Sequence, residues 1–402
     1  MNYTVQKRKE KFGIKDLAIL SIIAYIIISV AYDGTGLGSA KFASYGIYIC
    51  AALCGINVFF TKKLDFRTSY VLIIIFGLIL WISVGYSPTR EFIKDMYMYR
   101  FWTGMILFIL VSNTITTRKD IDKLLKTCVF AGAYLSINVY SKYGIAELAD
   151  AEDRLLSDIS DINMLGVFCG FSIIIAAIYM VFDKKHRFWY LASIIISVPF
   201  LMFTGSRKAV LLVIVGLIAF ILSYKNDRGM FLRVLAVIAV LGIIIFLIMN
   251  IPAFSVIRVH FEDMMNLFTG EGEMDQGDIN RVEYLERGWQ YFLEKPIIGN
   301  GFFSSFHYFN TYTHCNYVEL LMNNGIIGFA VYYLMRLLIL KNNIACRKRN
   351  DILAAMAITI SVGVLFCDVG VVTYYNRFLF IMIAIADKAS AILREEQRIG
   401  NK

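Results

Sequence analysis

A histidine at the start of an apolar run is the first candidate for chemistry in this chain. His314 stands in THCNYVELLMNNGIIG (313–328), where polar sequence gives way to a hydrophobic segment, and the chain has only four histidines. A neutral imidazole is the most common general base near neutral pH. The same side chain could also be an ordinary polar residue at the edge of a membrane, so this stretch alone leaves both interpretations open.

Basic residues beside a short break between two apolar segments are the second candidate. In LMFTGSRKAVLL (201–212), Gly-Ser separates the segments, Ser206 can cap the second helix, and Arg207 and Lys208 occupy its first turn. Cations close to the hydrocarbon core are costly, which makes them functional candidates. The alternative is that both side chains extend to the lipid headgroups.

A third candidate lies in NRVEYLERGWQYFLEKP (280–296). Asn280 and Glu283 have the spacing of a capping box, and Lys295-Pro296 is a stop signal, so a helix is predicted between them. Arg281 would then lie in the first turn, where free N–H groups and the helix dipole favour an anion such as phosphate. The apolar face of this helix is predicted to consist of Val282, Leu285, Trp289 and Phe292.

Composition and the length of the apolar runs indicate the elements that must position these residues. The 402 residues are 58% hydrophobic and 18% charged, whereas globular chains carry about 25% charged residues. Apolar runs such as 71–86 are long enough to cross a hydrocarbon core of about 30 Å, and in lipid they have to be helices. We predict an all-α polytopic membrane protein in which residues 1–402 form a single integral membrane domain. About twelve spans are predicted, at 17–32, 42–60, 69–86, 101–115, 127–143, 163–182, 188–204, 209–224, 234–250, 317–340, 352–371 and 378–393.

Basic residues set the predicted orientation. Every second connection between spans is basic, and these segments with the termini hold most of the 40 lysines and arginines; such residues concentrate in cytoplasmic loops. Both termini are therefore predicted to be cytoplasmic, and the first span is predicted to be retained because no small-residue cleavage site follows it. The net charge of +9 then reflects topology, which argues against a nucleic-acid partner. The predicted cytoplasmic segments include TKKLDFR (61–67), TTRKDIDKLLK (116–126), KNNIACRKRND (341–351) and the tail from Lys388.

Residues 251–316 are predicted to form a large, partly helical extracytoplasmic loop between spans nine and ten. Loops of this size are usually functional. Its tract GEGEMDQGD (270–278) lacks the spacing of a calcium loop, and a solvated turn is the preferred interpretation. The seven cysteines lie mostly inside spans and show no metal-ligand spacing. We expect no metal site, no cofactor and no disulfide framework.

Four segments in order carry a resemblance to a known family. They are RLLSDISDINMLGVFCG (154–170) with Arg154, Asn163 and Gly166, TGSRKAV (204–210) with Arg207, NRVEYLERGWQYFLEKPIIGNGF (280–302) with Arg281, Trp289, Pro296, Gly299 and Gly301, and HCNYVELLMNNGIIG (314–328) with His314. With these segments the chain resembles the O-antigen polymerase and O-antigen ligase family (Wzy/WaaL-type), which are bacterial membrane glycosyltransferases. One departure is Cys315, which separates His314 from Asn316 where family members often place the Asn directly after the His.

The resemblance implies a GT-C-like glycosyltransferase in the bacterial cytoplasmic membrane. Its donor and acceptor would be oligosaccharides linked through pyrophosphate to a polyprenyl lipid, presented at the outer face. Guanidinium groups bind phosphate in bidentate geometry, so Arg207, Arg281 and Arg154 are the predicted pyrophosphate ligands. His314 would be the general base of an inverting, metal-independent transfer. Membrane lipid, a flippase and chain-length regulator proteins are implied partners.

Six further residues are supporting candidates. Tyr317 would share a helix face with His314 and Leu321, and Glu319 could polarise the base or face a cavity. Asp368 could pair with one of the arginines, and Arg377 could touch substrate or reach the headgroups. Lys208 and Asn163 adjoin the predicted arginines, and Arg336 is expected to extend to the cytoplasmic interface.

Three functions remain open from the sequence. The preferred one is a polymerase that joins lipid-linked repeat units into capsule, exopolysaccharide or O-antigen. A composition rich in Ile, Lys, Asn, Phe and Tyr fits an AT-rich genome. Many such genomes belong to organisms without an outer membrane, which have no O-antigen ligase, so the composition favours the polymerase. The alternatives are an O-antigen ligase that transfers glycan to lipid A core, and a transporter or flippase, which would be expected to show internal repeats.

Overall fold

The all-α prediction is confirmed. The structure is a computed structural model of the chain, which describes residues 12–32, 40–61, 64–144, 162–224, 276–347 and 351–400 and scattered residues between them. All regular elements in these residues are helices. In chain order they are α1 (Ile14–Tyr32), α2 (Ala40–Thr61), α3 (Thr68–Val84), α4 (Glu91–Thr114), α5 (Arg118–Tyr143), α7 (Ile162–Phe182), the 3₁₀ turn η1 (Lys184–His186), α8 (Arg187–Phe203), α9 (Arg207–Ser223), α12 (Gln276–Glu294), α13 (Ser305–Phe309), α14 (Asn316–Ala345), α15 (Ile352–Cys367) and α16 (Arg377–Gly400).

Several of these helices suit a bilayer. Five are long and apolar enough to cross a membrane, and α3 and α15 are shorter apolar helices. Every predicted span except 234–250 overlaps a described helix. That span, Arg154 and residues 251–275 lie outside the continuous described ranges. The five candidate spans are in α1, α2, α7, α14 and the region of η1 and α8.

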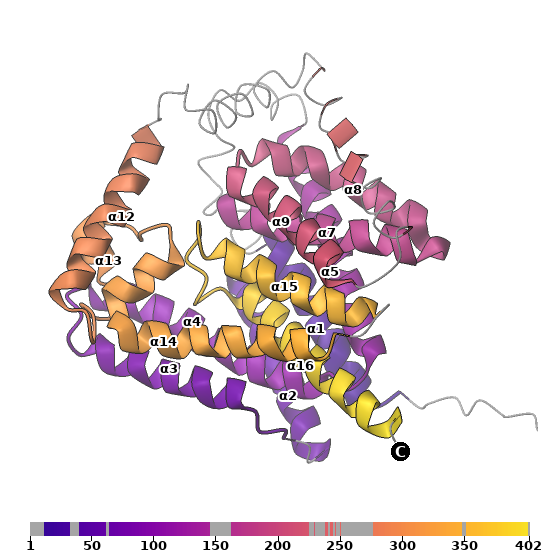
Figure 1. The fold of residues 1–402 in the computed structure, drawn as a ribbon, viewed down its shortest axis with the longest axis horizontal. Coiled ribbons are helices and arrows are strands. Elements are labelled where there is room, and N and C mark those ends of the chain that lie inside the picture. Colours follow the sequence, from indigo (N-terminus) through magenta and orange to yellow (C-terminus); the bar gives the residue numbers. More distant parts are fainter. Residues whose placement is uncertain are drawn as a thin grey trace, which may run out of the picture.

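The bundle has two ends that α3, α14 and α16 connect. At one end, the residues after α3 contact the segment before α13, where Ser87 Oγ donates to Phe302 O over 2.6 Å. α16 starts at this end with Arg377 and reaches the other end with its last turns. In Figure 1, α12 and α13 lie together at one end of the long axis, and the C-terminus lies at the other.

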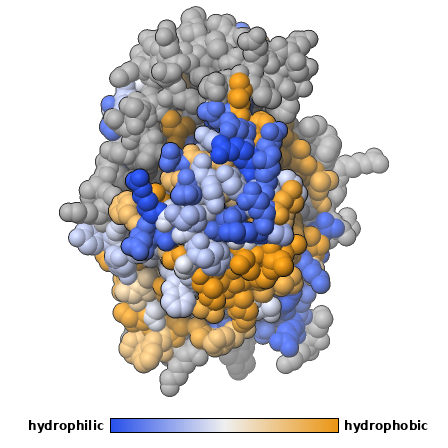
Figure 2. All heavy atoms as spheres, turned by 90° about the vertical axis from the view of Figure 1, so that its left-hand side faces the viewer, coloured by the Kyte–Doolittle hydropathy of each residue, from blue (hydrophilic) through white to orange (hydrophobic). Residues whose placement is uncertain are grey.

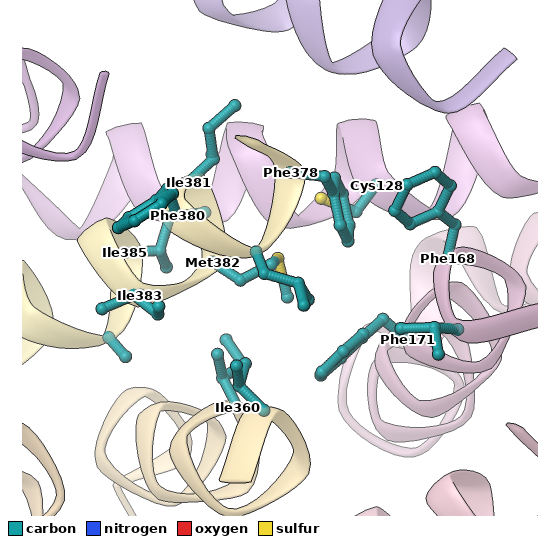
Figure 3. Packing of buried hydrophobic residues seen from close by; sticks show 14 of the residues in the cluster. Cys128, Phe168, Phe171, Ile360, Phe378, Phe380, Ile381, Met382, Ile383 and Ile385 are labelled. Carbon is teal, nitrogen blue, oxygen red and sulfur yellow. The ribbon is translucent and has the colours of Figure 1, made fainter. Parts of the chain in front are cut away.

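The core forms where α16 is enclosed by other helices. Phe378 to Ala386 in α16 are almost completely buried, as expected of a helix that is apolar on all sides. Figure 3 shows Phe378 near Phe168 and Phe171 of α7, with Ile360 of α15 below them. The rings of Phe168 and Phe378 meet edge to face with centroids 4.7 Å apart. Side chains from α7, α15 and α16 thus fix the helices that lead to the site.

The predicted span 317–340 lies within α14, which bends sharply at Gly325. Its φ of 60° and ψ of −167° are non-helical. The backbone N–H of Ile326 donates to Pro296 O over 2.8 Å, and Gly301 N–H donates to Asn323 O over 2.9 Å. The segment 296–301 therefore pairs with the backbone groups that the bend releases, which a membrane helix requires. A Cβ at Gly325 would meet the backbone of Ile297 and Ile298, so this segment packs directly against the bend.

Candidate active site

His314 lies just before α14, not on it. α14 begins at Asn316, and His314 has a φ of 59°, which is uncommon for a non-glycine residue. Its half-buried ring lies near two aromatic rings, with centroids 4.4 Å from Tyr312 and 6.4 Å from Tyr284. The prediction that His314 and Tyr317 share a helix face is therefore wrong. The direction of the imidazole is therefore set by the backbone conformation at His314 and not by the periodicity of a helix.

Two predicted cations act on this imidazole. Burial, together with the positive charges of Arg281 and Lys208, lowers the pKa of His314 from 6.5 to about 4. The ring is therefore neutral at pH 7 and available to accept a proton. Residues from three separate segments of the chain thus meet at one place.

Lys208 is held by the turn that follows α15. Its Nζ donates to Gly370 O over 2.7 Å. A Cβ at Gly370 would lie 2.0 Å from Lys208 Cδ, so the lysine side chain packs directly on Gly370. The turn after α15 therefore fixes the cation that acts on His314.

Arg207 opens α9, directly before Lys208. Gly205 turns the chain with a φ of 57°. Ser206 occupies the N-cap position, but its side chain makes no capping bond, contrary to the prediction. A Cβ at Gly166 of α7 would lie 3.1 Å from Ser206 Cβ, so α7 contacts this turn at Gly166. Asn163 lies three residues earlier, in the first turn of α7.

The predicted start and apolar face of α12 need correction. The helix begins at Gln276, so Arg281 lies in its second turn, away from the terminal N–H groups. Val282 and Trp289, which were predicted to be on the apolar face, are 41% and 47% exposed. Gly288 instead faces α14, and it packs so closely that a Cβ there would lie 2.8 Å from Val318 Cγ1. The face with Arg281, Tyr284 and Gly288 is the one that lies toward the site, since the Tyr284 ring lies near His314 and the charge of Arg281 acts on it. Figure 2 shows the α12 side of the molecule, with hydrophilic side chains gathered beside an apolar area.

Glu319 positions the loop before His314 and does not contact the imidazole. Its completely buried carboxylate accepts hydrogen bonds from Thr313 N (2.8 Å), Ser305 Oγ (2.5 Å) and Asn323 Nδ2 (2.8 Å). In place of the two roles considered for Glu319, polarising the base or facing a cavity, these hydrogen bonds give it a role in holding the loop. Its three donors tie α13 and the residue before His314 to α14.

Asn316 fastens the other side of His314. Its backbone N–H donates to Asp368 O over 2.8 Å, and its Oδ1 accepts from Thr373 N over 2.9 Å. Its Nδ2 donates to Tyr333 Oη over 2.9 Å. Tyr317 also points away from His314, because its hydroxyl donates to Leu365 O over 3.0 Å. Both side chains thus join α14 to the end of α15.

Asp368 forms a buried ion pair with an arginine, as considered from the sequence, and its partner is Arg336. Arg336 is 4% exposed and does not extend to the interface as predicted. Its Nη2 lies 3.8 Å from Asp368 Oδ2, and its Nη1 donates to Tyr332 Oη over 3.0 Å. Thr373 Oγ1 donates to the other oxygen of Asp368. An arginine inside one apolar run and an aspartate inside the next were the available signal, because such residues pair in membranes.

Arg377 is engaged by α4. Its Nε donates to Thr103 Oγ1 over 2.9 Å, and its guanidinium lies 5.1 Å from the ring centre of Tyr99. These contacts give it a structural role. Among the described residues, no group of three His, Cys, Asp or Glu side chains could share a metal ion.

Together the fold and the site define a class, namely a helical membrane protein with a neutral histidine and two cations at one end of the bundle. Residues 191–333 match the family model described as O-antigen ligase. This match agrees with the resemblance to the O-antigen polymerase and ligase family and supports an enzyme of that pathway. The match contains Arg207, Lys208, Arg281 and His314, whereas Asn163, Asp368 and Arg377 lie outside it. Comparison with curated proteins gave no match.

Substitution of Glu319 with glutamine is expected to lower kcat about 100-fold. An amide would face donors that now bind a carboxylate, which leaves a buried donor unsatisfied and shifts the loop that carries His314; displacements of this kind cost about that much. Steady-state elongation rates measure the effect. The matched control is Glu286→Gln on the exposed side of α12, which should keep wild-type kcat. Equal rates for both variants would show that Glu319 does not position the loop.

Proposed function

We propose that this protein is a polysaccharide polymerase. It would join polyprenyl-pyrophosphate-linked oligosaccharide repeat units, of capsule, exopolysaccharide or O-antigen, at the outer face of the cytoplasmic membrane. The observation that supports this is the neutral His314 beside Arg281 and Lys208, within the segment that matches the family. About twelve spans, one integral membrane domain and cytoplasmic termini remain part of the proposal.

The chemistry follows from the charges. His314 takes the proton from an acceptor hydroxyl, whose oxygen attacks the anomeric carbon of the donor. The bond from that carbon to the pyrophosphate oxygen breaks, and the electron pair leaves with the pyrophosphate. Arg207, Arg281 and Lys208 stabilise the charge that develops there. Attack on the face opposite the leaving group inverts the anomeric centre. Arg154, which lies outside the described residues, is proposed as a further pyrophosphate ligand.

Bound pyrophosphate would also tune the base. Arg281 and Lys208 help to keep the pKa of His314 low in the free protein. A pyrophosphate between these cations adds negative charge, which favours the protonated imidazole and raises its pKa. The base would therefore become stronger when the donor binds.

The pH dependence should reveal this coupling. The neutral base is lost as the pH falls through the pKa, so kcat/KM, which reports the free protein, should fall near pH 4. The acidic limb of kcat, which reports the complex, should lie at higher pH. Lys208→Gln should move the limb of kcat/KM upward, whereas Lys341→Gln, at the other end of α14, should leave it unchanged. A limb of kcat/KM above pH 6 in the wild type would contradict the assignment.

An O-antigen ligase is the second candidate, because the matched family model carries that description. Purified protein, lipid-linked repeat units and lipid A core in one reaction separate the possibilities. Ladders of long glycans are expected for a polymerase, and glycan on lipid A core for a ligase. Transport of the lipid-linked substrate without any new glycosidic bond would instead identify a transporter or flippase and overturn both enzyme proposals.

A further inference from the structure

A cavity of about 830 Å³ lies at the end of the bundle away from His314. Four segments contribute to it: the residues before and at the start of α3, Thr116, the end of α14, and the second half of α16. All four coincide with, or adjoin, segments that the sequence analysis assigns to the cytoplasm. α16 runs from Arg377 at the active-site end to Arg398 at this cavity, which is about 30 Å at 1.5 Å per residue. The cavity therefore opens on the membrane face opposite the proposed reaction.

The inner wall of the cavity is a rigid ion pair. Arg67 Nη1 donates to Asp387 Oδ2 over 2.9 Å, and the two side chains are 14% and 4% exposed. Ser69 Oγ also donates to Asp387, over 3.2 Å. These groups satisfy one another, so they form a fixed floor and are not the residues that would capture a ligand.

The rim offers cations that can turn toward a ligand. Arg398 has an 81% exposed side chain, and its Nη1 lies 3.9 Å from Glu395. Arg394 donates to Asn342 Oδ1 at the edge of the cavity. Phe66, Leu338 and Ile392 add apolar walls. The lining contains four basic and three acidic side chains, so the cavity combines a small excess of positive charge with apolar sides. Basic pockets between membrane helices bind anionic lipid headgroups.

We infer that this cavity binds an anionic phospholipid of the leaflet opposite the active site. Arg394 and Arg398 contact the headgroup phosphate, and an acyl chain lies along Phe66, Leu338 and Ile392. A soluble phosphate would use the rim but gain nothing from the apolar walls, whereas a phospholipid uses both. The volume also matches the range of about 300–1,000 Å³ that small ligands occupy. This inference does not depend on the proposed reaction.

The test is lipid binding by the full-length protein in detergent, followed by native mass spectrometry and thermal unfolding. The probes are phosphatidylglycerol, phosphatidylcholine, a short-chain phosphatidylglycerol and inorganic phosphate. The test variant is Arg394→Gln with Arg398→Gln. The matched control is Lys119→Gln with Lys341→Gln, which removes the same charge from exposed positions at the same end but outside the cavity.

Phosphatidylglycerol should bind and stabilise the wild type and the control. It should bind the test variant about thirtyfold more weakly, because each basic residue lost is expected to weaken binding roughly fivefold. The short-chain lipid should bind more weakly than the long-chain lipid. Arg394→Lys with Arg398→Lys should restore most of the binding, which separates lost charge from a folding defect. Equal binding by wild type and test variant would overturn the inference. If inorganic phosphate stabilised the wild type as much as phosphatidylglycerol does, the inference would also be overturned, and the ligand would be a soluble anion.

Discussion

Replacing His314 with alanine is expected to lower elongation by about 10²–10⁴-fold, the usual contribution of a general base. The half-buried imidazole lies beside Tyr312 and is made neutral by burial and by the charges of Arg281 and Lys208. Alanine leaves no group at this place that accepts the hydroxyl proton. Single-turnover formation of the glycosidic bond, measured with purified protein and lipid-linked repeat units, isolates the chemical step.

The matched control is His307→Ala, because His307 is exposed and belongs to the neighbouring α13. Both variants should remain in the membrane fraction and melt close to the wild-type temperature. His314→Gln should be as inactive as the alanine variant, since an amide cannot accept the proton. Full elongation by His314→Ala would remove the proposed base and with it the mechanism.

Replacing Gly325 with alanine is expected to destabilise the protein by more than about 3 kcal/mol. The φ and ψ of 60° and −167° fall in a region that essentially only glycine occupies, and strain there costs about 1–3 kcal/mol. The new Cβ would also lie 2.3 Å from Ile297 O. If the segment 296–301 moved away to relieve this clash, the backbone N–H groups at the bend would lose their hydrogen-bond acceptors, which is costly in lipid. Thermal unfolding in detergent and the yield of folded protein measure the loss.

Gly55→Ala is the control for this substitution, because a Cβ at that position in α2 would meet no atom within 4 Å. This variant should be as stable as the wild type or slightly more stable, since alanine favours a helix. If Gly325→Ala also unfolded at the wild-type temperature, α14 would not need the bend, and the pairing with 296–301 would have no role in holding the site.

The cations of the site and the base depend on different parts of the fold. Lys208 is held by Gly370, whereas the loop of His314 is held by Glu319 on one side and Asn316 on the other. The Asp368 backbone carbonyl accepts from Asn316, and the Asp368 side chain lies beside Arg336. The end of α15 is thus the common support of Lys208 and His314.

The sequence by itself determined the helices and the principal candidates. Apolar runs predict the positions of helices such as α7 and α15, because hydropathy and the need to satisfy backbone hydrogen bonds are local properties of the chain. His314 and Arg207 stood out for the same reason, since a titratable residue beside an apolar run is conspicuous without any knowledge of its neighbours. Arg281 stood out as a cation near the start of a predicted helix, which is also a local signal.

Only the tertiary structure decided what these residues do to one another. The bend at Gly325 requires 296–301 to supply hydrogen-bond partners, and the low pKa of His314 requires burial together with Arg281 and Lys208. Glu319 binds a loop, not the base, and Arg336 finds Asp368 inside the bundle. Each of these contacts joins segments that are distant in the chain or separated by a bend. Periodicity describes one helix at a time, whereas the charge on an imidazole depends on every group that folding brings near it.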